Sequence, residues 1–469
     1  MTEQKSATSP AAATTNAHAS SEAATQSTSS EWATTRWWAI AVLLAAYVVS
    51  FIDRQIMALM VEPISRDLAL SDTEFSVLHG LAFAIFYCLL GLPFGRLADS
   101  VSRTRLVAAC IVLWSVMTMA CGLARGFYSL FAARIGVGVG EAGLSPAAYS
   151  LISDYFPPER RARALSVYAL GISLGVGFAY LLGGMIIAFA NLAGPVRIPL
   201  LGEFRGWHLV FILAGLPGLL IAPFALLMRE PRRAITDAQS RSVPLSEVVA
   251  FIRERSTTFI NLFLGLALVL SAVHGAGAWW PTYFIRTHGW SIGQISLVLG
   301  LLSLTAAVGG TYFGGYVSDR LQQKGVVDAT IRTCAFGISV AAPFMVAAPL
   351  LQNPWFVVAA YAIANFFIMT PWGAAAAAVQ LVTPRHLRGQ MSALYLATIN
   401  IVGLTAGPLV IGVLNDAVFT GKAGIGNSMA AAWTVSLAGG LALLWTGLSP
   451  FRRDARSILA TELTANDKR

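Results

Sequence analysis

Charged residues are scarce in this chain of 469 residues. Asp, Glu, Lys and Arg make up 12% of it, against about 25% in a typical soluble protein, and 56% is hydrophobic. Apolar runs of 18 residues or more recur between Trp37 and Leu448, long enough to cross a bilayer as helices. The ten-residue alternation of a transmembrane β-barrel does not occur. The composition excludes an ordinary soluble domain and predicts an all-α polytopic membrane protein.

Cysteine and catalytic motifs are scarce as well. The 4 cysteines lie in apolar segments without metal or redox spacing, so we interpret them as small hydrophobic residues. No nucleophile elbow, metal-binding triad or Walker loop occurs, and Gly136-Val-Gly138 lies inside an apolar run with no strand before it. We therefore predict that the protein is not an enzyme, binds no metal and needs no cofactor. A proton gradient is the energy source that we expect.

Twelve apolar spans divide the chain into two sets of six. They cover residues 37–59, 76–98, 104–123, 127–152, 164–190, 208–228, 258–284, 291–317, 331–351, 354–380, 389–415 and 427–448. We predict twelve transmembrane helices in two pseudo-symmetric six-helix bundles, residues 36–228 and 258–448. Residues 1–35, rich in Ala, Ser and Thr, predict a disordered tail and no signal peptide. Residues 229–257 form a linker, and residues 449–469 form a polar C-terminal tail.

Basic residues lie unevenly between the spans. Of the Lys and Arg residues at or beyond the ends of the spans, 24 lie in the tails and alternate connections on one side, and 6 lie on the opposite side. Basic connections stay in the cytoplasm, so we predict a protein of the plasma (inner) membrane with both termini cytoplasmic. The net charge of +9 then follows from topology and from attraction to anionic lipid headgroups, and it requires no nucleic-acid partner.

The chain also repeats itself. Gly95-Arg-Leu-Ala-Asp99 after the second span is echoed by Gly315-Tyr-Val-Ser-Asp319 after the eighth span. A parallel six-plus-six repeat is typical of transporters, in which the binding site lies between the halves near the middle of the membrane.

Four charged residues lie deep inside the apolar spans of the first half. Arg134 and Glu141 are seven residues apart, about 20° from one helical face, in a stretch whose glycines allow another backbone to approach closely. Asp53 and Arg54 lie in the first span, and Asp53 reaches a depth similar to that of Arg134. Such charges are costly in lipid, so they indicate either a transport pathway or a structural ion pair.

Neighbours in a helix differ by about 100°, so only one of Asp53 and Arg54 can point straight at a cavity, and we predict Asp53. Asp53 and Glu141 are the predicted proton-coupling residues, and Arg54 and Arg134 are predicted to bind substrate. Anionic substrate that competes for Arg134 would release a carboxylate to take a proton. The alternative is a permanent pair, Asp53–Arg134 or Glu141–Arg, that fixes helix contacts.

The second half has almost no charge inside its spans. Its candidate substrate-binding residues are polar: His274, Asn365, Tyr395 and Asn400. For His274 a satisfied interior position remains the alternative. Trp279 and Trp280 are predicted to anchor a span end at the membrane surface. A charged wall opposite an apolar wall favours an amphipathic cavity, which suits a lipid with an anionic or zwitterionic head better than a sugar.

A set of charges at the cytoplasmic ends of the spans could hold that side closed. The predicted gate comprises Gly95, Asp99, Arg103, Arg105, Asp154, Arg160, Asp319 and Arg320. Carboxylates there can pair with the arginines or face a helix N-terminus. Ordinary interfacial charges are the alternative.

Between residues 37 and 448 the chain resembles the major facilitator superfamily, on the motif Gly95-Arg-Leu-Ala-Asp99 followed by Arg103 and Arg105 and repeated at Asp319-Arg320. Ser100 and Ser102 depart from the family's motif. Within the superfamily the first half is similar to the Spinster group, in Phe51-Ile-Asp-Arg54, residues 134–143 and residues 154–163.

The resemblance implies alternating-access transport of lysolipids, sphingosine phosphate-like lipids or other amphiphiles, coupled to protons, by a monomer in contact with membrane lipids. A proton-linked organic-anion or drug carrier is the alternative within transport, and a receptor or scaffold is the alternative outside it.

Overall fold

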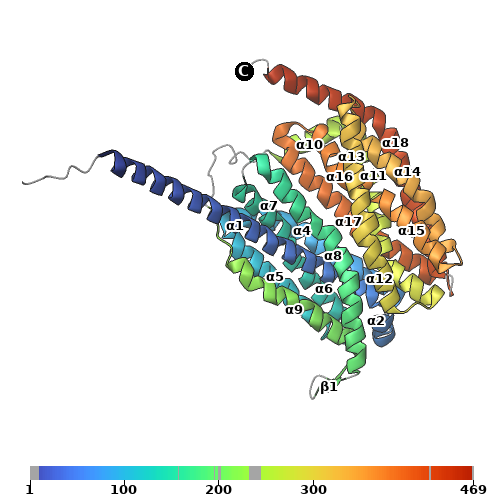
Figure 1. Cartoon of the computed structure of the whole chain (residues 1–469). Helices are drawn as coiled ribbons and strands as arrows, with labels where there is room; N and C mark the ends of the chain where they lie inside the picture. Colours follow the sequence, from blue (N-terminus) through green and yellow to red (C-terminus); the bar gives the residue numbers. More distant parts are fainter. Residues whose placement is uncertain are drawn as a thin grey trace, which may run out of the picture.

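The computed structural model describes residues 10–156, 158–194, 196–198, 202–231, 244–421 and 424–466. Side chains are described from residue 35 to residue 460 with short gaps, one of which is Asp99. Apart from one short hairpin, the described elements are helices, which confirms the predicted all-α class (Figure 1).

The first half runs from α1 to α9. Its elements are α1 (Pro10–Leu59), α2 (Val61–Leu68), α3 (Asp72–Ser76), the π-helical turn η1 (Val77–Leu81), α4 (Ala82–Ser100), α5 (Arg103–Cys121), α6 (Phe127–Ala142), α7 (Leu144–Tyr155), α8 (Pro158–Ala193), the antiparallel strands β1 (Val196–Ile198) and β2 (Gly202–Phe204), and α9 (Gly206–Leu226). The linker contains α10 (Leu245–Glu254).

The second half has the same number of membrane-crossing segments. Its elements are α11 (Ser256–His288), α12 (Ile292–Leu302), the π-helical turn η3 (Ser303–Ala307), α13 (Val308–Gln323), α14 (Ala329–Ala347), the short η4 (Ala348–Leu350), α15 (Pro354–Ile368), α16 (Thr370–Leu381), the short η5 (Arg385–Leu387), α17 (Arg388–Ala417) and α18 (Gly424–Asn466).

Among the described residues, eleven helices are long and apolar enough to cross a membrane. The predicted fourth span is not one of the eleven, because Gly143 divides it into α6 and α7. Pro146 explains this break, since it has no N–H to offer the carbonyl of Ala142. Together α6 and α7 extend from Phe127 to Tyr155 and complete the twelve predicted crossings.

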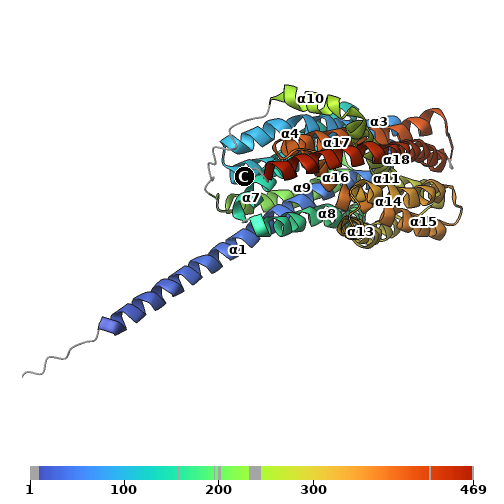
Figure 2. The same ribbon diagram turned by 90° about the horizontal axis from the view of Figure 1, so that it is seen from above.

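Two bundles lie side by side, as the structure seen from above makes clear (Figure 2). In the first, α1 packs on α8 and α5 packs on α6 and α9; in the second, α11 packs on α17 and α18. The bundles meet where α1 contacts α11, α8 contacts α12, and α17 contacts α3, η1 and α4. The site between the halves therefore has walls from both bundles.

The helical segments extend beyond the predicted spans. Helix α1 begins at Pro10 and projects from the bundle (Figure 1), and α18 continues to Asn466. Side chains before residue 35 and after residue 460 lie outside the described part. The disorder expected for residues 1–35, and the limits of the linker and the C-terminal tail, therefore stay predictions.

Irregularities in the helices repeat at a fixed spacing. A shift of 226 residues takes Val77, where η1 begins, to Ser303, where η3 begins. The same shift takes the break at Gly143 to Met369, between α15 and α16. The second and eighth crossings thus both contain a π turn, and the fourth and tenth are both broken. The internal repeat read from Asp99 and Asp319 extends to the shapes of the helices.

The glycines of α6 bring it against its neighbours. A Cβ on Gly140 would lie 2.5 Å from the backbone nitrogen of Trp114 on α5, and a Cβ on Gly138 would lie 2.6 Å from the carbonyl oxygen of Phe83 on α4. Any larger side chain would push these helices apart. The close packing expected for this stretch holds Arg134 and Glu141 inside the first bundle.

Candidate functional site

A central charged cluster, defined as Asp53, Arg54, Arg134 and Glu141, lies within the first half. Arg54 on α1 pairs with Glu141 on α6, and both its Nε and its Nη2 lie 2.5 Å from Glu141 Oε2. The Glu141 side chain is 0% exposed and that of Arg54 is 17% exposed. An ion pair in this setting joins α1 to α6 and leaves a small part of the Arg54 side chain exposed.

Three aromatic rings surround Arg54 and form what we name the aromatic cage. The Cζ atom of Arg54 lies 4.9 Å from the ring centre of Phe51, 4.6 Å from that of Phe83 and 4.7 Å from that of Tyr87. Cation–π contacts of this kind stabilise a guanidinium away from water. Arg54 is thus held both by a carboxylate and by the faces of rings from α1 and α4.

Asp53 occupies the more buried position. Its residue is 0% exposed, Oδ2 accepts a hydrogen bond of 3.2 Å from Thr118 Oγ1, and Oδ1 has no hydrogen-bond partner among the described residues. That Asp53 points at a cavity stays a prediction; of the two neighbours, Arg54 is the more exposed. The two side chains have different partners, because Arg54 pairs with Glu141 on α6 and Asp53 accepts from Thr118 on α5.

Arg134 makes no ion pair with Asp53 or with any other described carboxylate. Its Nε donates a long hydrogen bond of 3.5 Å to the main-chain oxygen of Leu78, in the π turn η1, and its Cζ lies 5.5 Å from the ring centre of Phe83. The alternative of a permanent Asp53–Arg134 pair is therefore not what this structure contains, whereas a Glu141–Arg pair is present and uses Arg54.

The polar candidates of the second half do not gather at one point. Asn365 Nδ2 donates to the carbonyl of Leu302, at 3.4 Å, and Asn400 Nδ2 donates to Leu396 in its own helix, at 2.8 Å. Tyr395 is buried, with its ring 5.5 Å from that of Phe263. His274 faces α17, where a Cβ on Gly403 would lie 3.2 Å from His274 Cδ2.

Trp279 and Trp280 are interior residues, so their predicted role as anchors at the membrane surface was wrong. Both are at most 1% exposed. Trp279 Nε1 donates to the carbonyl of Pro408, and Trp280 packs on the rings of Tyr361 and Trp433. Their position near the end of the predicted span suggested a place at the membrane surface. Helix α11 continues to His288, and both rings are buried.

Gln55, which the sequence did not single out, connects the halves beside Arg54. Its Nε2 donates 2.7 Å hydrogen bonds to the hydroxyl of Tyr180 on α8 and to the carbonyl of Gly277 on α11. An amide in an apolar span next to a charged pair was the available signal.

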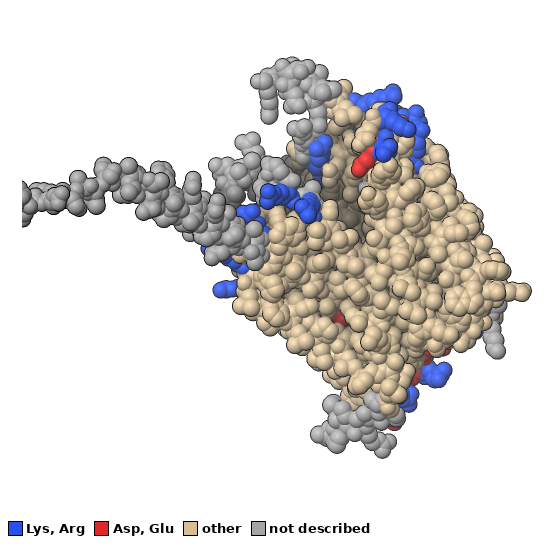
Figure 3. Space-filling view, in the orientation of Figure 1, with Lys and Arg blue, Asp and Glu red and all other residues tan. Residues whose placement is uncertain are grey.

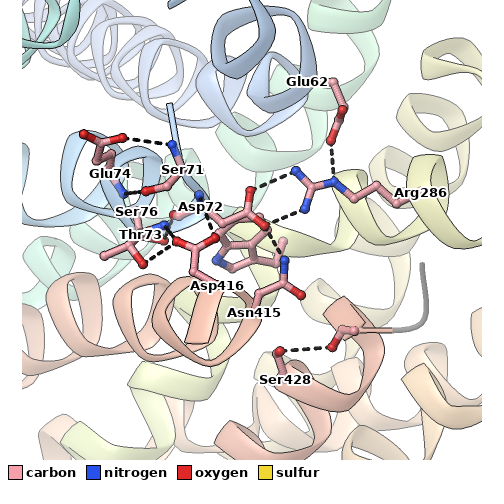
Figure 4. A network of polar contacts seen from close by, with 12 residues as sticks. Glu62, Ser71, Asp72, Thr73, Glu74, Ser76, Arg286, Asn415, Asp416 and Ser428 are labelled. Atoms are coloured by element: carbon pink, nitrogen blue, oxygen red, sulfur yellow. Dashed lines mark hydrogen bonds and ion pairs between the residues drawn. The ribbon is translucent and has the colours of Figure 1, made fainter. Parts of the chain in front are cut away.

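We call the end of the bundle that carries α10 and Glu230 the linker end, and the opposite end, at Asp72, the far end. A far-end network joins the halves (Figure 4). Arg286 on α11 donates from Nε to Glu62 at 2.5 Å, and from Nη1 and Nη2 to the two oxygens of Asp72 at 2.5 and 2.8 Å. The fork geometry of this Arg–carboxylate contact fixes both partners.

Helix α17 completes the far-end network. Asn415 donates to the carboxylate of Asp72, while Asp416 accepts from the backbone N–H of Thr73 at 2.8 Å and from its hydroxyl at 2.6 Å. Glu62, Asp72 and Thr73 belong to the first half, and the other members belong to the second. These contacts therefore close the far end between the halves.

The linker end carries its ion pairs within one half. Arg103 donates to Asp154 at 2.5 Å and to Glu230 at 2.8 Å, and Ser102 and Thr104 also donate to Glu230. Burial disfavours the charged form of Glu230, but these hydrogen bonds outweigh it and lower the pKa of its carboxyl. Arg103 and Asp154, two members of the predicted gate, thus pair with each other, yet this contact does not bridge the two bundles.

Other members of the predicted gate stay apart. Arg105, Arg160, Asp319 and Arg320 are exposed, and Arg320 Cζ lies 5.0 Å from the ring of Tyr316. Gly95 lies on α4 near Pro146, and the side chain of Asp99 lies outside the described part. Figure 3 shows basic residues gathered at the linker end, around a hollow between the halves.

Residues 43–408 match the family model of the major facilitator superfamily. The chain belongs to the major facilitator superfamily. It is 29% identical over 423 residues to a protein described as an MFS-type efflux pump of Mycolicibacterium smegmatis, covering 89% of this chain and 93% of that protein. It is 27% identical to human Protein spinster homolog 1, covering 80% and 72% of the two chains.

A solved structure agrees with this assignment. The crystal structure of a bacterial homologue of the human lysosomal transporter Spinster, in an inward-facing and unoccupied conformation, has a TM-score of 0.73 and 26% identity, and covers 91% of this chain and 98% of that one. The resemblance to the Spinster group is thereby confirmed. As a member of the superfamily, the chain is an integral membrane transporter of small molecules.

Proposed function

We propose that the protein moves an amphiphile with an anionic or zwitterionic head by alternating access, coupled to protons. The observation that carries the proposal is the Arg54–Glu141 pair inside the aromatic cage. An amphiphile needs a charged partner for its head and apolar surface for its tail. The first half offers the charge, and the second half offers a wall almost free of it.

The closed far end sets the side from which substrate enters. Arg286 and Asp72 tie the halves together there, whereas at the linker end the Arg103–Asp154 pair stays within the first half and the Arg452–Asp328 pair stays within the second. We assign the linker end to the cytoplasm of a plasma membrane, because basic residues gather on that side. Substrate would enter from the cytoplasm and reach Arg54 first.

Exchange of partners at Arg54 provides the coupling. The head of the substrate binds the guanidinium of Arg54, whose side chain is 17% exposed, and competes with Glu141, whose side chain is 0% exposed. A buried carboxylate that loses its partner is more stable when it is protonated. Glu141 then takes a proton, and Asp53, with one unpartnered oxygen, is a second acceptor in the same cluster. Arg134 lies further along the route and contacts the head after Arg54.

Proteoliposomes test this scheme. Purified protein is first screened for thermal stabilisation by lysolipids, sphingoid phosphates and organic anions, and the best stabiliser is then used for flux under an imposed pH gradient. We expect an inward or outward proton gradient to drive flux in the wild type and to lose its effect in Glu141→Gln and Asp53→Asn. Wild-type coupling in both variants would end the proposal.

A proton-linked carrier of organic anions or drugs is the second candidate. The similarity to an efflux pump of Mycolicibacterium smegmatis favours it. Competition separates the two functions: displacement of a bound probe by lipids with long acyl tails supports the amphiphile, and displacement by small sugar acids or drugs supports the alternative.

A further inference from the structure

The π turn η1 places an unassigned histidine between the central charged cluster and the far-end network. His79 is the middle residue of Val77–Leu81, and its Nδ1 is shielded from solvent without a hydrogen-bond partner among the described residues. Its ring stacks on Phe75 at 6.2 Å. A π turn inserted in a helix is frequently found at a functional site. The unpartnered ring nitrogen needs a polar group that the described chain does not supply.

Three helices converge on His79. On one side, Arg134 of α6 donates to the carbonyl of Leu78, the residue before it. On the other side, a Cβ on Gly80 would lie 2.3 Å from the carbonyl oxygen of Leu404 on α17. The preceding residue of α17, Gly403, is the one that packs on His274 of α11. His79 and His274 therefore flank the same stretch of α17, and the guanidinium of Arg134 lies beside them.

The π turn η3 of the second half differs from η1 in the polar side chains that surround it. The 226-residue shift takes His79 to Thr305, whose hydroxyl donates to Leu301 of its own helix at 2.6 Å. The side chain that donates toward η3 is the neutral Asn365, which contacts Leu302. In the second half these polar groups are neutral and find partners in the protein. In the first half, the place of Thr305 is taken by His79 with its unpartnered ring nitrogen, and the side chain that donates near the π turn is the cation Arg134, from a different position of the broken helix.

Along the second crossing, His79 lies between the aromatic cage around Arg54 and the far-end network. His79 is four residues from Phe83 and eight from Tyr87, both in the cage, and seven residues from Asp72 in the far-end network. At 1.5 Å per residue, His79 lies about 10 Å from Asp72 and about 6–12 Å from the cage. An anionic head that leaves Arg54 for the far end would pass it.

We infer that His79, with Arg134 and His274, forms a second anion-binding position on the pathway, between the aromatic cage and the far end. The Nδ1–H group of His79 donates to a phosphate or carboxylate oxygen of the substrate, while Arg134 supplies the positive charge. His274 faces the same oxygen atoms from the second half. The inference rests on the proposed function and adds a substrate-positioning residue to it.

Variants at His79 test this position. His79→Leu removes the donor, and His79→Gln keeps one. Because binding from the linker end uses Arg54, we expect the affinity of His79→Leu for an anionic lysophospholipid to change less than two-fold. Passage past His79 loses a hydrogen bond to a charged group, so its transport rate in proteoliposomes should fall about ten-fold. His79→Gln should restore most of the rate.

Two controls make the outcome specific. Thr305→Val, at the matching place of the second half, should leave the rate unchanged, and the uncharged monoacylglycerol analogue should move equally well in wild type and His79→Leu. A wild-type rate for the anionic lipid in His79→Leu would overturn the inference, and so would an equal loss for the uncharged analogue. If the wild type moves neither lipid, the proposed function fails, and this inference fails with it.

Discussion

The two halves share the shape of their helices but differ in charge. Each has a π turn in its second crossing and a break in its fourth, related by the same 226-residue shift. In each, a side chain from the broken helix donates to a carbonyl at the π turn: Arg134 to Leu78 in the first half and Asn365 to Leu302 in the second. The repeat thus supplies the same helix shapes twice, whereas the central charged cluster lies in the first half, where the proposed function places binding of the substrate's head.

The largest effect should come from breaking the Arg54–Glu141 pair. Glu141→Leu leaves a buried guanidinium without its carboxylate and should cost about 3–5 kcal/mol of stability. The double variant Arg54→Met with Glu141→Leu should recover most of that loss and still show no proton coupling. Denaturant titration of purified protein measures the first effect and flux measures the second. A double variant as unstable as the single one would show that the pair is not what holds α1 against α6.

The two side chains that donate to carbonyls near the π turns, Arg134 and Asn365, test the difference between the halves directly. Arg134→Gln should lower transport of an anionic substrate at least about ten-fold, because a charge-assisted contact is lost. Asn365→Ala should change it less than about three-fold, since its 3.4 Å hydrogen bond is long and neutral. Initial transport rates in proteoliposomes at several substrate concentrations measure the loss in each variant. Equal losses in the two variants would refute the assignment of substrate binding to the charged half.

The far-end network should control which end is open. Arg286→Met removes three hydrogen bonds between the halves, so we expect the population open at the far end to rise about ten-fold. Spin labels at the exposed positions Glu74 and Val418, one in each half, report the distance. A distance distribution identical to that of the wild type would mean that packing of α17 on α3 keeps this end closed without the ion pairs.

The smallest effect should come from the linker end, where the ion pairs stay within one half. The pKa of Glu230 is lowered in the fold, so its contribution to stability is present above its ordinary value of 4.5 and fades as the pH falls through the lower folded value. Glu230→Gln should therefore lower stability at pH 7 by less than about 1 kcal/mol, given its partial exposure, and by nothing in strong acid. Thermal unfolding measured against pH checks this, and a loss that grows toward acid would have the wrong sign.

Much of the architecture follows from the sequence. Apolar runs predict the crossings, because only helices satisfy the backbone in lipid, and charges inside such runs point to the pathway. The motif at Asp99 and Asp319 predicts the repeat. Helical spacing also predicts that Asp53 and Arg54 face different directions.

Pairings between helices could not be predicted in the same way. Whether Asp53 or Arg54 meets Glu141 depends on the rotation of α1, which its packing on α8 and α11 decides. The far-end residues Glu62, Asp72 and Arg286 look like ordinary interfacial charges in the sequence and become a network only when the halves meet. The π turn at His79 has no local sequence signal, because it arises from the fit of η1 against α6 and α17.

Proton uptake on substrate binding tests the central claim, that substrate exchanges with Glu141 for Arg54. Purified protein in weakly buffered solution is mixed with its stabilising amphiphile, and a pH indicator reports protons taken from the medium. We predict uptake close to one proton per substrate in the wild type and in the exposed control Glu74→Gln, and none in Glu141→Gln. Binding without uptake in the wild type, or unchanged uptake in Glu141→Gln, would contradict the account.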